Sequence, residues 1–102
     1  MIDFEKNRRE HIRWIVILAL NLARPNGIGE SLILSTIQGI PMQCTALELR
    51  KELDYLEGCK FIEITQKHAV QWLPKLTSLG IDLAEYVIEC PAGIARSPKY
   101  WV

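Results

Sequence analysis

The side chains that most often carry catalysis or bind metals are few in this sequence and far apart. The cysteines are Cys44, Cys59 and Cys90, and the histidines are His11 and His68. A zinc site needs Cys or His ligands at short spacing, and a nucleophile needs a base that converges on it. No Cys-x-x-Cys pair, Cys/His cluster or Ser-His-Asp set is present. We therefore expect no enzymatic activity, no cofactor, no metal ion and no small-molecule substrate.

The bulk properties indicate one globular domain in a reducing compartment. A chain of 102 residues leaves no room for a second core, and an odd number of widely spaced cysteines is typical of cytosolic proteins. The longest apolar run, Trp14 to Leu20, is too short to cross a bilayer. Twelve basic and twelve acidic residues cancel, so DNA could be bound only through local basic patches.

Side chains suited to DNA occur in three local groups. They are Gln43, Thr45, Arg50 and Lys51 at the third helical segment, Lys67 and His68 in a polar turn, and Arg8 and Arg9 near the N-terminus. Arg and Gln read base edges, while Lys and Arg bind phosphates. However, residues 44–57 hold four acids against two bases, and this net negative charge repels phosphate. An ordinary solvated helix face is the alternative interpretation of this segment.

Two helices are expected before residue 40. Residues 3–23 carry apolar side chains at intervals of three and four, and Asp3 can cap the start. The sequence Pro25-Asn26-Gly27 ends this helix. A shorter helix is expected over residues 29–38. Its inward residues would be Leu32, Ile33, Leu34 and Ile37.

The third helix has the clearest signals. It is expected over residues 45–57, with Ala46, Leu49, Leu53 and Leu56 in a single apolar stripe. Thr45 followed by a glutamate three residues later predicts a capping box. Gly58 is expected to end the helix in a left-handed turn.

A hairpin and a fourth helix complete the pattern. Strands are expected over residues 61–65 and 70–73, joined by the turn 66–69 and ended by Pro74. Thr77 is expected to start a helix that runs to about Glu89. Its apolar face would contain Leu79, Leu83, Ala84, Val87 and Ile88. Residues 1–90 would form the domain, followed by an extended tail over 91–102.

This order predicts an α+β, mainly α fold of the winged helix-turn-helix type, with three helices, a two-stranded hairpin wing and a C-terminal helix. The third helix would be the recognition helix, and turn 66–69 would be the tip of the wing.

Two stretches and the tail carry a resemblance to known proteins. Residues 49–62 and 76–84 resemble the recognition-helix, wing and post-wing segments of winged helix regulators of the ArsR and MarR type. With the tail residues Pro91, Gly93, Arg96 and Pro98, the whole chain is similar to a family of small winged helix proteins of Mu-like phages and prophages. The resemblance implies a protein in the cytoplasm of a bacterial host cell.

Two functions are compatible with these features. The leading hypothesis is a phage or prophage DNA-binding protein with a regulatory or genome-handling role. The alternative is a protein–protein adaptor in phage assembly or host interaction. We also expect a homodimer, because the first helix has more apolar surface than one core needs and the chain ends in aromatic residues. The interface candidates are Ile17, Leu18, Tyr86 and Trp101.

Overall fold

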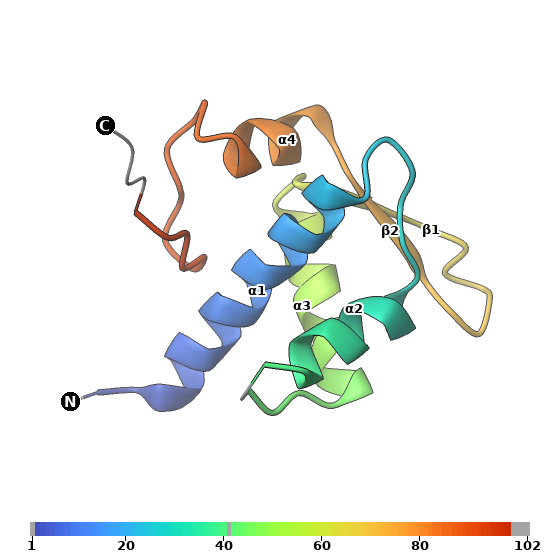
Figure 1. The fold of residues 1–102 in the computed structure, drawn as a ribbon, viewed down its shortest axis with the longest axis horizontal. Coiled ribbons are helices and arrows are strands. Elements are labelled where there is room, and N and C mark those ends of the chain that lie inside the picture. Colours follow the sequence, from blue (N-terminus) through green and yellow to red (C-terminus); the bar gives the residue numbers. More distant parts are fainter. Residues whose placement is uncertain (1, 41, 99–102) are drawn as a thin grey trace.

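The computed structural model describes residues 2–40 and 42–98 of the chain (Figure 1). Over these residues the elements are α1 (Phe4–Leu22), α2 (Glu30–Gln38), α3 (Ala46–Gly58), β1 (Ile62–Thr65), β2 (Leu73–Leu76) and α4 (Ser78–Ala84). The expected α+β, mainly α class is confirmed, as is the order of the elements. No helix in this part of the chain is long and apolar enough to span a membrane.

Helix α1 is the longest element and crosses in front of α3 in Figure 1. It starts where predicted, because the Asp3 carboxylate accepts a hydrogen bond from the amide of Lys6. Its inner side supplies a large part of the core against α3, α4 and the hairpin. The buried residues of α1 are Ile12, Trp14, Val16, Ile17 and Leu20.

Helix α2 buries a narrower face than predicted. Ile33 and Ile37 lie one turn apart and are fully buried. Leu32 is 58% exposed, so its predicted inward position is wrong. The reason is helical geometry, since Leu32 lies about 100° around the axis from Ile33.

Helix α3 confirms its predicted start and three of the four residues of its predicted stripe, while Ala46, in the first turn, is exposed. The Thr45 hydroxyl accepts from the amide of Glu48, and the Glu48 carboxylate accepts from the amide of Thr45. Leu49, Leu53 and Leu56 are buried. The predicted left-handed turn at Gly58 is wrong, because Gly58 is the last helical residue and Lys60 takes the positive φ of 71°.

The hairpin pairs β1 with β2 in a register that matches Ile62 to Leu76 and Ile64 to Pro74. The second strand was predicted over 70–73, and this is wrong by three residues. The amide of Thr77 donates to the Phe61 carbonyl, so residues 61 and 77 form a hydrogen-bonded pair. Hydrogen-bonded and non-hydrogen-bonded pairs alternate along an antiparallel ladder, so Ile64 and Pro74 form a non-hydrogen-bonded pair. Pro74 therefore lies inside β2 instead of ending it, because no ladder bond needs its missing amide.

Helix α4 starts as predicted but is shorter. The Thr77 hydroxyl accepts from the amide of Gly80, and the helix ends at Ala84 instead of Glu89. Leu83 and Ala84 are buried, whereas Leu79 and Val87 are 40% and 69% exposed, so their predicted burial is wrong. Tyr86, at φ 63°, lies just beyond the helix end.

The segment after α4 packs back on the domain. Ile94 is buried, and the amide of Ala95 donates to the Glu10 carbonyl in α1. The Arg96 guanidinium donates to the carbonyls of Leu83 and Ile88. Residues 93–96 therefore join α1 to the α4 region.

Candidate binding surface

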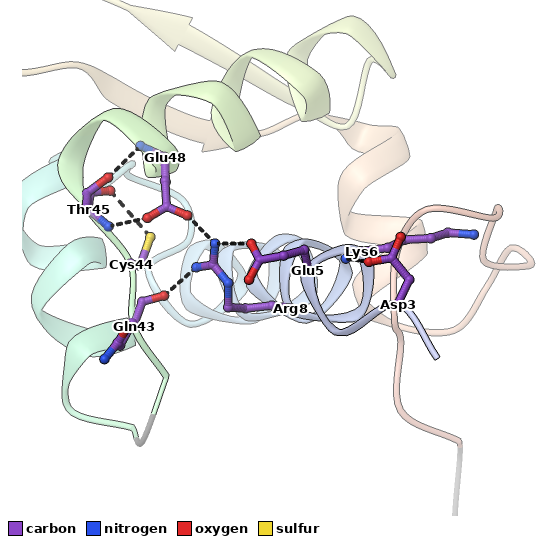
Figure 2. Close-up of polar contacts among 8 residues, drawn as sticks. All are labelled: Asp3, Glu5, Lys6, Arg8, Gln43, Cys44, Thr45 and Glu48. Carbon is purple, nitrogen blue, oxygen red and sulfur yellow. Dashed lines mark hydrogen bonds and ion pairs between the residues drawn. The ribbon is translucent and has the colours of Figure 1, made fainter. Parts of the chain in front are cut away.

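The predicted DNA-binding residue Arg8 is held between two carboxylates. Its guanidinium pairs with Glu5 at 3.0 Å and with Glu48 in α3, and it donates to the main-chain oxygen of Gln43 at 2.6 Å (Figure 2). The hydrogen bond with Glu48 raises the pKa of Arg8, and the same bond lowers the pKa of Glu48. The ion pair of Arg8 with Glu48 therefore links the start of α1 to the start of α3.

Next to this contact lies the buried Cys44. Burial raises the pKa of its thiol, so the protonated and unreactive form prevails at neutral pH. Together with the half-buried Cys59 and Cys90, it is a free cysteine. No group of three or more metal-ligating side chains occurs in residues 2–40 and 42–98.

A second ion pair crosses from α1 to α3 in the interior. The Arg13 Nε atom lies 2.7 Å from Glu52, whose residue is only 5% exposed. The Arg13 guanidinium also donates to the Gly93 carbonyl and stacks 3.7 Å from the Tyr55 ring centroid. In the sequence Glu52 is only one of the four acids of residues 44–57, and no local signal marks it as the partner of Arg13, 39 residues away.

Arg50 is held at the base of the loop that connects β1 to β2 (residues 66–72, the hairpin loop). Its guanidinium bonds both carboxylate oxygens of Glu30 in α2, at 2.5 and 2.8 Å, and the carbonyl of Val70. It also stacks 4.5 Å from the Trp72 ring. The Glu30 carboxylate in turn accepts from the amide of Trp72, and the Trp72 carbonyl accepts from the amide of Glu30. These bonds attach residue 72 to α2, which is why β2 begins only at residue 73.

Lys67 attaches the other side of the hairpin loop to α3. Its ammonium lies 2.6 Å from Glu57 and 3.3 Å from Asp54. The bond to Glu57 raises the pKa of Lys67. The predicted wing-tip lysine is therefore directed toward α3.

All four acids of α3 thus form ion pairs with cations from other elements, although Asp54 and Glu57 share the single ammonium of Lys67. Together with residues 44–57, the ion-pair partners bring five cations against six carboxylates. The net charge of this region is therefore −1 with these partners, against −2 for residues 44–57 alone. The same bonds occupy three of the basic residues that were expected to contact DNA, namely Arg8, Arg50 and Lys67.

The remaining predicted DNA-binding residues are spread over the surface. Gln43 and Thr45 are exposed, but the Thr45 side chain is used in the capping box. Lys51 and His68 are exposed and Arg9 is half-buried, and none of the three makes a hydrogen bond or ion pair within the described residues.

An open groove lies between α2, the start of α3 and the hairpin loop, with a volume of about 350 Å³. Its lining includes the apolar side chains of Leu34, Ala46 and Leu49, with Val70 and Arg50 also contributing. Val70 is 97% exposed, and the neighbouring α3 residue Leu47 is 65% exposed. The sequence does not reveal this apolar surface, because the pattern around Val70 predicts a strand.

The predicted dimer residues have different positions in the fold. Ile17 is fully buried within the single chain, so it is not available to a partner. Tyr86 is half-buried, packs edge-on against Trp14 and donates to the Ser97 carbonyl. Leu18 is 40% exposed on α1. Trp101 lies outside the described residues.

Comparison with known proteins adds information on the fold alone. No protein-family model matches the chain, and no curated protein matches it either. Among solved structures, the chain is similar to the crystal structure of AF1382 from Archaeoglobus fulgidus. The TM-score is 0.57 at 13% sequence identity, over 76% of this chain and 79% of that chain.

The ion pairs predict that acid destabilises the protein. Arg50, Arg8 and Lys67 lower the pKa values of Glu30, Glu48 and Glu57 respectively. A carboxylate whose pKa is lower when folded stabilises the fold above its unfolded pKa, and that contribution is lost as pH falls. We expect the urea midpoint to decrease as the pH falls below about 4.5, the ordinary value for glutamate. Glu30→Gln should show a shallower decrease, and a midpoint that stays constant through this range would contradict the prediction.

Proposed function

We propose that this chain is a winged helix domain that acts as a protein–protein adaptor, the alternative raised by its sequence. The winged helix assignment is supported by the order of three helices, a hairpin and a helix, with α3 directly before the hairpin. In this interpretation α3 occupies the place of a recognition helix and the hairpin loop that of a wing.

The observation that carries the adaptor proposal is the engagement of Arg8, Arg50 and Lys67 in internal ion pairs. DNA affinity depends on cations that are free to replace the counterions of phosphates. Around α3 and the hairpin loop, the groups left exposed are largely neutral. Leu47, Val70 and the apolar groove beside them suit the side chains of a protein partner. The similarity to Mu-like phage proteins favours a partner from phage assembly or from the host cell.

Site-specific photo-crosslinking tests this proposal in the organism that naturally makes the protein. A benzophenone amino acid placed at Leu47 or at Val70 should give a discrete adduct with another protein. Glu63, exposed on β1, is the matched control position and should give none. Adducts with DNA, or the same adducts at all three positions, would refute the adaptor function.

DNA binding is the second candidate, and the unpaired Lys51 on α3 is the observation that favours it. A fluorescence-anisotropy titration with the organism's genomic DNA at about 50 and about 200 mM salt distinguishes the two. Under the adaptor proposal we expect no saturable binding even at the lower concentration. Binding that is lost at the higher salt and weakened at least several-fold by Lys51→Glu would support DNA binding instead. Lys51 is the better test than Arg50, because its removal breaks no internal bond.

A further inference from the structure

Both outer edges of the hairpin are closed to the backbone of a partner at the middle of each strand. Ile64 and Pro74 form a non-hydrogen-bonded pair, so their main-chain groups point outward from the ladder. The Ile64 amide donates to the Glu57 carboxylate at 3.0 Å. Pro74 has no amide, and a Cβ atom added at Gly27 would lie only 2.3 Å from the Pro74 carbonyl oxygen, so the segment before α2 covers this edge. A partner therefore cannot bind by adding a strand to this sheet.

The polar side chains that line the apolar groove between α2, α3 and the hairpin loop already bond one another. Glu30 and Arg50 form an ion pair with two hydrogen bonds. The Gln71 side-chain oxygen accepts from the amide and from the hydroxyl of Ser31. The rest of the lining is apolar and consists of Leu34, Ala46, Leu49 and Val70. Such a groove favours apolar side chains, because a polar group placed in it would lose its water for partners that are already engaged.

The same lining favours a helix over an extended or irregular segment. A helix bonds its own main-chain amides and carbonyls, so it can bury apolar side chains in the groove without leaving those groups unpaired. An extended segment would bring main-chain amides to side chains that are already bonded. Apolar anchors at intervals of three and four residues are the usual form of helix recognition by a groove.

Lys51 adds a positive charge beside the exposed apolar residues of α3. It follows Leu47 by four residues, so the two lie on the same face of the helix, one turn apart. Lys51 is exposed and makes no hydrogen bond or ion pair within residues 2–40 and 42–98. The groove lining contains one acid, Glu30, and one base, Arg50, so Lys51 gives the groove and its α3 margin a net charge of +1. A carboxylate on a partner would be attracted there, and a basic side chain would be repelled.

We propose that the partner of this chain binds through an amphipathic helix with an acidic flank. Its apolar side chains enter the groove against Leu34, Leu49 and Val70, and a glutamate or aspartate beside them meets Lys51. The inference rests on the proposed adaptor function, and it specifies the structure and the charge of the segment that the adaptor binds.

Two synthetic peptides test this proposal by NMR of the labelled protein. Both are alanine-based helices with leucines at intervals of three and four residues; one carries glutamates beside the leucines, and the other carries lysines at the same positions. The glutamate peptide should shift the amide resonances of Leu34, Leu49 and Val70. It should bind about two- to fivefold more tightly than the lysine peptide, which is the effect of one exposed ion pair. Raising the salt to about 0.5 M should remove most of this difference.

Charge reversal at Lys51 tests the position of the acidic flank. Lys51→Glu should reverse the order of the two peptides, because it repels the glutamates and attracts the lysines. Lys6→Glu is the matched control, since it makes the same change in net charge at an exposed position on α1, outside the groove lining, and should leave the order unchanged. The amide spectra also check that both variants remain folded, which is expected because both side chains are exposed.

Equal affinities for the two peptides, or a preference that Lys51→Glu leaves unchanged, would overturn the proposal. So would the absence of shifts around the groove at about 1 mM glutamate peptide. Shifts confined to the amides of Ile62 and Ile64 would also overturn it, by indicating strand addition to β1. Photo-crosslinking separates these failures from a failure of the adaptor function. If adducts form at Leu47 and Val70 but the peptides show no charge preference, the adaptor function stands and the acidic helix is wrong; if no adduct forms, the adaptor function itself fails.

Discussion

Glu52→Ala should lower the free energy of unfolding by about 3–5 kcal/mol, the cost of leaving a buried charge without its partner. Glu52 is 5% exposed, and the Arg13 side chain that it pairs with is 13% exposed. After the substitution the guanidinium keeps only the Gly93 carbonyl and the Tyr55 ring. Urea denaturation at neutral pH measures the loss, with Glu63→Ala as the exposed control that should change stability by less than about 0.5 kcal/mol.

A double variant separates the two possible causes of this loss. If the unpaired Arg13 charge causes it, Arg13→Met combined with Glu52→Leu should recover most of the stability, because the pair is replaced by apolar side chains. Additive losses in the double variant would contradict this explanation. The amide of Ala95 should also exchange faster in Glu52→Ala, because Arg13 positions the Gly93 carbonyl in the same segment.

Local signals in the sequence predicted most of the fold. Caps at Asp3, Thr45 and Thr77 act within three residues of themselves, so the starts of α1, α3 and α4 could be located. The second strand could not, because its start depends on bonds between Trp72 and Glu30, which are 42 residues apart. The end of α3 was placed one residue too early for a different, local reason: Gly58 was expected to end the helix in a left-handed turn, but it is the last helical residue and Lys60 takes the positive φ instead.

The candidate site was harder to predict because it depends on pairs that are distant in sequence. The sequence shows which basic residues the chain has, but whether each is free to bind a ligand depends on which carboxylates the fold brings to it. Arg8 meets Glu48 across 40 residues, and Arg50 meets Glu30 across 20. Residue types and helical spacing can indicate which side of a helix is polar. They contain no information on which of its charges are already neutralised.

Gly80→Ala should destabilise the domain by about 3 kcal/mol, because α4 packs on the hairpin through this glycine. A Cβ atom at Gly80 would lie 2.0 Å from the Phe61 carbonyl oxygen and 2.9 Å from a Leu76 methyl group. The carbonyl is main chain and already accepts from the amide of Thr77, so it cannot move without disturbing the hairpin. Gly58→Ala is the matched control, since a Cβ there meets no atom within 4 Å and alanine favours the helix by about 0.5–1 kcal/mol. Thermal denaturation should therefore move the two midpoints in opposite directions, and an unchanged midpoint for Gly80→Ala would mean that α4 is not packed on β1 in this way.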